Sequence, residues 1–271
     1  MNPLLDPVAK LVIAHRGNSA FAPENTLESF QQALALGADA LEFDVRLSRD
    51  GKAVVMHDPT LERTTNGSGP VNALTLAELQ RLDAGCRFSR DGGRTFPYRA
   101  RGLTIPSLDL VLSNFPDAPF ILEIKTPAAS AEVKRLLTSA GAEGRCVVGG
   151  FDDAAMAPFR GSAIAHGASR REIVRLYARA LLPGGPRRLP YQALAIPPTS
   201  SLLPLPVLRF ARMARGAGAS THVWTIDDPE RARRYFAGGV NGIITNDPAA
   251  ILASLGRASA APPQRPLSPA A

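Results

Sequence analysis

Hydrophobic residues recur along the chain as short runs, separated by longer stretches in which apolar positions have helical spacing. Near-continuous apolar runs of this kind are typical of parallel strands that are buried on both faces. Eight strands that alternate with helices predict an α/β protein, a closed (β/α)8 TIM barrel formed by residues 1–256 as one domain. The eight runs begin near Leu11, Ala40, Phe120, Cys146, Ala163, Ala193, His222 and Gly242.

Helix boundaries are marked by capping residues between the apolar runs. An amphipathic stretch over 27–34 follows the first run, and Asn25 with Glu28 predicts a capping box at its start. Gly37 predicts the end of this helix, because glycine is the preferred residue just past a helix C-terminus. Asp228 followed by Pro229 predicts another helix start, with an N-cap residue and proline at the first helical position.

Three segments depart from the barrel pattern. Residues 58–104 are too many for a loop and contain a capping box of their own, Thr75 with Glu78, which predicts a small insertion after the second strand. Loops that follow barrel strands face the active site, so this insertion is expected there. Residues 181–206 are rich in proline and predict an irregular loop, and the Ala/Pro/Ser-rich residues 257–271 predict a disordered tail.

Composition narrows the protein class. The chain of 271 residues contains two cysteines, Cys86 and Cys146, which excludes a disulfide framework and a cysteine-rich zinc site. It has no run of 18 apolar residues, which argues against a membrane-spanning helix and stable membrane insertion. Residues 1–10 lack the basic and then apolar order of a secretory signal, so a cytoplasmic protein is expected.

The net charge of +7 is not by itself the signature of a nucleic-acid-binding protein. Of 31 basic residues four are lysine, and the arginines form only small clusters with no aromatic residues between them. No nucleic-acid-binding module is recognisable, so we interpret these clusters as solvated surface and expect no nucleic-acid partner. A basic field that attracts small phosphate-bearing substrates remains compatible with this pattern.

Carboxylates inside the apolar runs are the first candidates for chemistry. Glu42 and Asp44 are two residues apart in a predicted strand, so both side chains leave the same face, and Glu123 ends a later run. Three carboxylates that converge would repel one another unless a cation neutralised them, and oxygen ligands favour Mg²⁺ or Ca²⁺ over zinc. The alternative is that Glu42 and Asp44 form structural ion pairs with Arg16 or Arg46.

Two histidines end apolar runs, at the position where catalytic residues of barrels gather. His15 ends LVIAH and His57 ends AVVMH, and imidazoles that titrate near neutrality can divide the roles of general base and general acid. A structural, hydrogen-bonded histidine is the alternative for each. Arg16 offers a planar fork for a phosphate and Lys125 a compact positive charge. His222 is interpreted as filling the barrel interior.

These residues belong to a series of motifs that occur in the order typical of one family. The chain resembles the glycerophosphodiester phosphodiesterase family over roughly residues 11 to 255, and the combination of motifs in the N-terminal half is highly specific. The matching segments are His15–Gly17, Pro23–Thr26, Glu42–Val45, His57–Pro59, Arg63–Gly67, Ile105–Leu108, Glu123–Lys125, Val223–Thr225 and Gly239–Thr245.

The resemblance implies a metal-dependent hydrolase that converts glycerophosphodiesters to sn-glycerol 3-phosphate and an alcohol, on a TIM barrel with a small insertion. The chain departs from the family pattern at Asn241 and Asn246, where aspartates are common, and at Gly150, where a serine is common. The resemblance therefore does not define the substrate contacts on that side of the barrel. The implied roles are metal ligation by Glu42, Asp44 and Glu123, acid–base catalysis by His15 and His57, and substrate contact by Arg16, Lys125 and Trp224.

Two other functions are compatible with the sequence. One is a lysophospholipase D type activity on lysolipids, with an apolar surface formed by residues 202–208. These residues can also be interpreted as the packed start of the sixth helix, and we favour that interpretation. The other is a non-catalytic barrel that binds a phosphate ligand, which the intact histidine pair and carboxylate trio oppose. The sequence leaves open the head group, the choice between Mg²⁺ and Ca²⁺, the oligomeric state, and which histidine is the base.

Overall fold

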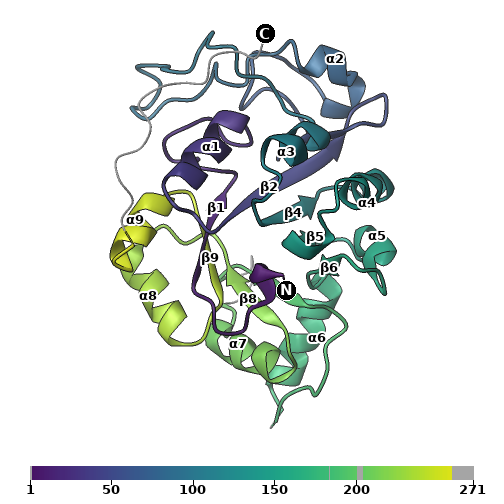
Figure 1. The fold of residues 1–271 in the computed structure, drawn as a ribbon, viewed down its shortest axis with the longest axis vertical. Helices are drawn as coiled ribbons and strands as arrows, with labels where there is room; N and C mark the ends of the chain where they lie inside the picture. The colour runs from purple at the N-terminus through teal and green to yellow at the C-terminus, as the bar shows by residue number, and fades with distance from the viewer. Residues whose placement is uncertain (1, 183, 200–203, 258–271) are drawn as a thin grey trace.

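The computed structural model describes residues 2–182, 184–199 and 204–257. Figure 1 shows a ring of strands surrounded by helices. The eight strands of the ring are parallel, as expected for a (β/α)8 barrel. They are β1 (Leu11–His15), β2 (Ala40–Leu47), β4 (Phe120–Ile124), β5 (Cys146–Gly149), β6 (Ala165–His166), β7 (Ala193–Ile196), β8 (Ser220–Val223) and β9 (Gly242–Thr245).

The strand order is β6-β5-β4-β2-β1-β9-β8-β7, and the ring closes between its first and last members. At this junction Gly167 forms a parallel bridge with Ala193, and the amide of Ala168 donates to the Ala193 carbonyl at 3.0 Å. β6 contains two residues, so the fifth barrel unit is the shortest, although it is complete enough to close the barrel.

The helices follow the strands as the capping pattern predicts, with one correction. Thr26, not Asn25, is the N-cap of the first helix, and its hydroxyl accepts from the Ser29 amide. Asn25 has a φ of 58° and donates from its side chain to the buried Asp44 at 3.0 Å. The helices outside the insertion are α1 (Leu27–Ala35), α3 (Leu108–Asn114), α4 (Ser130–Ser139), α5 (Asp153–Met156), α6 (Arg170–Ala180), α7 (Val207–Gly216), α8 (Pro229–Ala237) and α9 (Pro248–Ser254).

A hairpin precedes the insertion that follows the second strand. β2 continues beyond the ring and pairs antiparallel with β3 (Ala53–Val55), in the register Val45 with Val55. His57 therefore follows an antiparallel strand, which differs from the expected carboxyl end of a ring strand. The predicted capping box of Thr75 and Glu78 is present at the start of α2 (Leu76–Leu79), which packs over a small apolar core of the insertion.

The side chains of β2 alternate between the barrel interior and the helical layer. Phe43 packs outward, with its ring centroid 5.4 Å from that of Phe30 on α1 and 5.2 Å from that of Phe120 on β4. Because successive strand residues point to opposite faces, Glu42 and Asp44 are directed into the barrel. The aromatic contacts thus fix the strand that carries two of the candidate metal ligands.

The N-terminal segment covers the amino ends of the strands. The short 3-10 helix Pro3–Leu5 buries Leu4 completely, and the Asn2 amide donates to the Cys146 carbonyl at 2.7 Å. Asn241, one of the departures from the family pattern, donates to the Asp6 carbonyl at 3.1 Å. Asn241 is therefore a structural residue that holds this segment in place at the amino ends of the strands.

Two expectations concern the C-terminal part of the chain. Residues 258–271 of the expected tail lie outside the described residues, as do Leu202 and Leu203. Arg257, which the sequence assigned to the tail, instead pairs with Asp39 at 2.6 Å. Leu205 packs against the apolar core and Val207 begins α7, as the helix interpretation of this stretch predicts. Within the described residues, no helix is long and apolar enough to cross a membrane.

Candidate active site

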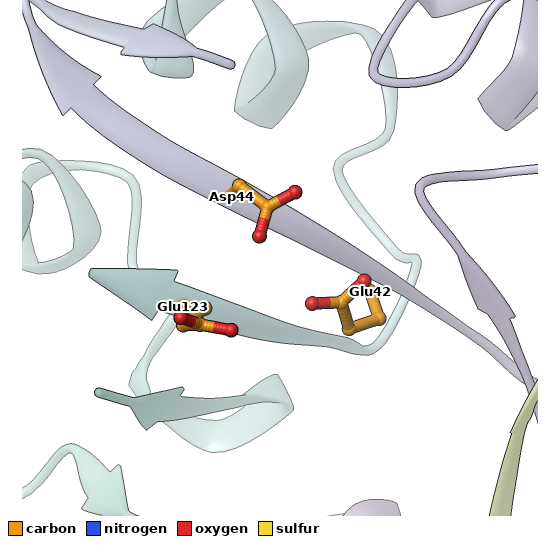
Figure 2. Close-up of side chains that lie close together, drawn as sticks. All are labelled: Glu42, Asp44 and Glu123. Carbon is orange, nitrogen blue, oxygen red and sulfur yellow. The ribbon is translucent and has the colours of Figure 1, made fainter. Parts of the chain in front are cut away.

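The three candidate metal ligands meet at the carboxyl ends of neighbouring strands. Figure 2 shows Glu42 and Asp44 on β2 and Glu123 on β4, with their carboxylates directed toward a common space. Asp44 and Glu123 are register partners in the β2–β4 pair, and one oxygen from each of the three residues lies within 4.8 Å of the others. The convergence expected from strand alternation is present.

Two basic side chains contact this cluster. The Lys125 ammonium lies 2.8 Å from Asp44 and 2.7 Å from Glu123, and the Arg16 guanidinium lies 3.2 Å from Asp44. The ion pair of Arg16 with Asp44 therefore exists beside the proposed metal site. Within the described residues, Arg46 forms no ion pair with these carboxylates; its guanidinium donates to the His57 carbonyl at 2.9 and 2.7 Å.

The pKa values of Glu42 and Asp44 are shifted in opposite directions. Burial opposes ionisation of Asp44, but Lys125 and then Arg16 outweigh it and lower the pKa of this carboxyl. For Glu42, burial and then repulsion by Asp44 and Glu123 raise the pKa well above its ordinary value. Among the described residues, no lysine or arginine side chain lies within 4.0 Å of the Glu42 carboxylate. The cluster is thus short of positive charge at Glu42.

His15 is oriented by a chain of hydrogen bonds through Asn246. The Asn246 amide nitrogen donates to Asp227 at 2.8 Å, which turns its oxygen toward His15 Nδ1 at 2.7 Å. His15 therefore carries its proton on Nδ1 and presents the free lone pair of Nε2, 3.8 Å from Glu42. Burial and then the neighbouring Arg16 lower the pKa of His15, so its contact with Glu42 is not an ion pair.

His57 is oriented by a carboxylate. Its Nδ1 donates to Asp58 at 2.6 Å, and the other Asp58 oxygen accepts from Arg63. The hydrogen bond from Arg63, together with that from His57, lowers the pKa of Asp58 to about 2, so the carboxylate is charged at neutral pH. Arg63 also binds Glu24 at 2.7 and 2.8 Å, which links this pair to the barrel.

The two histidines, the two basic groups and the carboxylates of Glu42 and Glu123 line one cleft of about 120 Å³, and the buried Asp44 contacts Lys125 of this lining. Arg16 is fixed there by Glu24 at 2.8 Å, and Lys125 by the carboxylates. The opposite wall is apolar and contains Trp224, as expected for a substrate contact. The further lining residues of this wall are Gly149, Gly150, Phe151, Gly167, Ala168, Ile173 and Ala195.

Close packing explains the glycine that departs from the family pattern in this wall. A Cβ on Gly150 would lie 2.8 Å from the methyl group of Met156 and 3.2 Å from the Ile124 carbonyl oxygen. A serine would therefore require the end of the Met156 side chain to move and the Ile124 carbonyl to shift by a few tenths of an ångström. The next residue, Phe151, packs edge-on against Trp224 with ring centroids 6.1 Å apart. This wall therefore has an aromatic surface next to the position at which the family pattern has a serine hydroxyl.

Several residues of the site escaped the sequence interpretation. Asn246 departs from the family pattern yet orients His15, and no local pattern in the sequence identifies its partner Asp227. Asp58 adjoins His57 in sequence, and that adjacency is the one signal that identifies a histidine partner. His222 is buried, bonds to Ser220 and has its pKa lowered to about 4 by burial, as expected for a residue that fills the barrel.

Comparisons with known proteins agree with this site. The model of the glycerophosphoryl diester phosphodiesterase family matches residues 15–250. A glycerophosphodiester phosphodiesterase of Caldanaerobacter subterraneus subsp. tengcongensis is 33% identical over 250 residues, which cover 89% of this chain and 96% of that protein.

Solved structures show the same architecture. A glycerophosphodiester phosphodiesterase of Agrobacterium tumefaciens superimposes with a TM-score of 0.73 at 27% identity, covering 90% of this chain and 99% of that one. An Oleispira antarctica phosphodiesterase, solved in complex with the product sn-glycerol-3-phosphate, has a TM-score of 0.74 at 26% identity, with 91% and 96% covered. The chain therefore belongs to the glycerophosphoryl diester phosphodiesterase family and is a phosphoric diester hydrolase.

Proposed function

We propose that this enzyme hydrolyses glycerophosphodiesters to sn-glycerol 3-phosphate and an alcohol, with a divalent cation held by Glu42, Asp44 and Glu123. The observation that carries the proposal is one cleft in which two differently oriented histidines accompany this carboxylate cluster. The relatives named glycerophosphodiester phosphodiesterase, and the related structure with bound sn-glycerol-3-phosphate, support the substrate class.

The donor set suits a hard cation. All three side chains offer oxygen, and Lys125 and Arg16 leave the charge of Glu42 uncompensated, which is the position that a divalent ion would neutralise. When bound, such an ion supplies positive charge for the phosphate oxygens and orients the substrate. Mg²⁺ and Ca²⁺ both fit this set of ligands.

We assign the proton transfers from the partners of the two histidines. His15 is buried, neutral and held by an amide, so its Nε2 lone pair is suited to accept the proton of the attacking hydroxyl. His57 is held through Nδ1 by the charged Asp58, which directs its Nε2 toward the cleft and suits the donation of a proton to the departing alcohol. His15 is therefore the proposed base and His57 the proposed acid.

The basic side chains would hold the phosphate between the histidines. Arg16 and Lys125 are both fixed by carboxylates, so they present their charge without losing conformational freedom on binding. Attack at phosphorus in line with the leaving alkoxide is then favoured by orientation as well as by charge. The alcohol would lie against the apolar wall of Trp224 and Phe151.

The nucleophile that we favour is the substrate hydroxyl next to the phosphoester carbon, because an internal nucleophile has a large effective concentration. Its attack on phosphorus releases the alcohol and leaves a cyclic phosphodiester of glycerol, which water must then open to give sn-glycerol 3-phosphate. The test compares glycerophosphocholine with its 2-deoxy analogue under saturating divalent cation, with kcat measured separately from KM. A strong loss of kcat is expected for the analogue. Equal kcat values would exclude internal attack and leave water as the nucleophile.

A lysolipid substrate is the second candidate, since the cleft has an apolar wall. Its volume of about 120 Å³ is nevertheless small beside the roughly 300–1,000 Å³ of pockets that enclose drug-sized ligands. We therefore expect faster turnover of glycerophosphocholine than of lysophosphatidylcholine when both are assayed with Mg²⁺ or Ca²⁺. The reverse ratio would identify the lysolipid as the better substrate.

A further inference from the structure

The net positive charge of this protein is concentrated in one stretch of the chain. Residues 173–226 contain seven arginines and neither lysine, aspartate nor glutamate, so their charge of +7 equals that of the whole chain. The other residues balance to neutrality. Six of the seven arginines are exposed and Arg179 is half-buried. The basic residues that look scattered in sequence therefore form a strongly asymmetric field.

The same stretch also exposes aliphatic side chains. Leu181 and Leu182, which follow α6, are 74% and 56% exposed, Val174 on α6 is 63% exposed, and Leu208 at the start of α7 is 41% exposed. Large apolar side chains exposed together at arginine-rich surfaces mark interaction sites, because each keeps unfavourable contact with water until a partner covers it. These leucines are therefore candidates for a buried contact.

The charged and apolar groups meet where α6 and α7 pack side by side, along the lower edge of the barrel in Figure 1. Arg187, Arg209 and Arg212 line an open depression between the residues after α6 and the outer side of α7. Arg209 donates to the Leu182 carbonyl at 2.9 Å, so a guanidinium and the exposed leucine pair are held together. A second depression shares Pro186 with the first and is lined by further arginines of α6.

Acidic groups do not compensate this surface. In the described part of the chain, the carboxylate that lines either depression is Glu172. Glu172 is 5% exposed, accepts from the Ser169 amide at 2.8 Å and lies 3.5 Å from Arg160. Its carboxylate is thus held by the start of α6 and by Arg160.

We propose that this region, the α6–α7 surface (Leu181, Leu182, Arg187, Leu208, Arg209 and Arg212), binds peripherally to the surface of an anionic phospholipid bilayer. Arginines attract the acidic head groups, and leucines that enter the acyl boundary remove apolar area from water. A nucleic acid would satisfy the arginines alone. Proteins that bind single strands use exposed aromatic rings, whereas Tyr177 beside this surface packs edge-on against Phe210.

The surface lies at the opposite end of α6 from the catalytic cleft. Ile173, in the first turn of α6, lines the cleft, and Leu181 lies eight residues further along the same helix, roughly 12 Å away. Bilayer binding through Leu181 and Leu182, at the other end of α6, would therefore leave the mouth of the cleft open to the solvent, from which a water-soluble diester enters.

The proposal is tested with the full chain and sedimented vesicles, which does not depend on the enzymatic activity. Vesicles with about 30 mol% phosphatidylglycerol in phosphatidylcholine are compared with pure phosphatidylcholine, at low salt and at about 0.5 M salt, where screening is strong. We expect binding to the anionic vesicles at low salt, and its loss on the neutral vesicles and at high salt.

Two double variants separate the contributions of charge and apolar contact. Arg187→Glu with Arg212→Glu should weaken vesicle binding by roughly 25-fold or more, at about fivefold for each arginine. Leu181→Ser with Leu182→Ser should weaken it by roughly tenfold or more without changing the net charge. The matched control reverses two exposed arginines of α8, Arg231→Glu with Arg233→Glu, and should leave most of the binding intact.

Three outcomes would overturn the proposal. These are equal binding to neutral and anionic vesicles, equal loss in the α8 control, and retention of binding by the leucine variant, which would reduce the effect to general electrostatic attraction. Binding of a DNA duplex as tight as that of the anionic vesicles would identify a nucleic acid as the partner instead. Thermal unfolding of each variant, unchanged from the parent, ensures that lost binding is not lost fold.

Discussion

The two walls of the catalytic cleft differ in almost every physical property. The wall formed by β1, β2 and β4 carries the histidine, arginine, lysine and carboxylate groups, nearly all fixed by hydrogen bonds or ion pairs. The wall formed by the ends of β5 to β8 carries glycines, alanines, Ile173, Phe151 and Trp224. The first wall holds charge in fixed positions, and the second has shape and apolar surface.

This difference indicates a division of labour. Fixed charges stabilise a transition state because they need no reorganisation when the reaction occurs, so the charged wall is expected to determine the rate. The apolar wall contacts the part of the substrate that changes least, and is expected to determine which alcohol binds. Substitutions in the first wall should therefore lower kcat, and those in the second should mainly change KM.

The largest expected effect is loss of the divalent cation from the charged wall. Excess EDTA should reduce turnover of glycerophosphocholine to background, with Mg²⁺ or Ca²⁺ restoring it better than Zn²⁺. Glu42→Gln should weaken cation binding, measured by calorimetry, while leaving the fold intact. Asp109→Asn, an exposed carboxylate-to-amide change on α3, is the matched control. Full activity in EDTA would remove the metal from the mechanism.

The next effect concerns the proposed acid and base. His15→Ala and His57→Ala should each lower kcat by about 10²–10⁴-fold. The double variant should lose much less than the product of the two factors, because the pair acts in one step. A substrate with a good leaving group, such as a nitrophenyl diester, should rescue His57→Ala but not His15→Ala. Rescue of the opposite variant would exchange the two roles.

A smaller effect is expected from Asn246, which positions His15. The pKa of His15 is lowered from its ordinary value of 6.5, so this base becomes protonated only at more acidic pH. The acid limb of kcat/KM should therefore lie below pH 6.5. The hydrogen bond that His15 Nδ1 donates to the Asn246 side-chain oxygen opposes this lowering. Asn246→Ala should therefore shift the limb further toward acid and lower kcat by roughly tenfold, through loss of ring orientation. A limb that moves toward higher pH would contradict this arrangement.

The smallest effect is expected in the apolar wall. Phe151→Ala removes a half-exposed ring that packs on Trp224, and should raise KM a few-fold with kcat within about twofold. Val174→Ala removes an exposed apolar side chain of α6 outside the cleft and is the control. A loss in kcat comparable to that of the histidine variants would show that the two walls do not divide rate and binding.

Sequence alone predicted the parts of this protein that depend on local periodicity. Strand runs marked the eight ring strands, and alternation placed Glu42 and Asp44 on one face, where Phe43 packs outward between them. The caps at Thr75 and Asp228 were also predicted, because capping involves residues within one turn of each other. These features are encoded within a few consecutive residues.

Where local signals competed, tertiary contacts decided. Asn25 has a side chain suited to an N-cap, but it donates instead to the buried Asp44, and Thr26 is the N-cap residue. Arg46 was one of two alternative ion-pair partners for the carboxylates, but its side chain reaches the His57 carbonyl across the β2–β3 hairpin. Burial raises the free-energy cost of an unpaired polar group, so a buried polar group pairs with whichever partner the tertiary structure places beside it.

The remaining features join residues that are far apart in sequence. His15 and Asn246 meet because β1 and β9 are neighbours in a closed ring, and no spacing in the chain reports that contact. The asymmetry of charge likewise became a surface only when α6 and α7 packed together. Local periodicity thus determined the strands and the ligand residues, whereas closure of the barrel determined how those residues are oriented, charged and protonated.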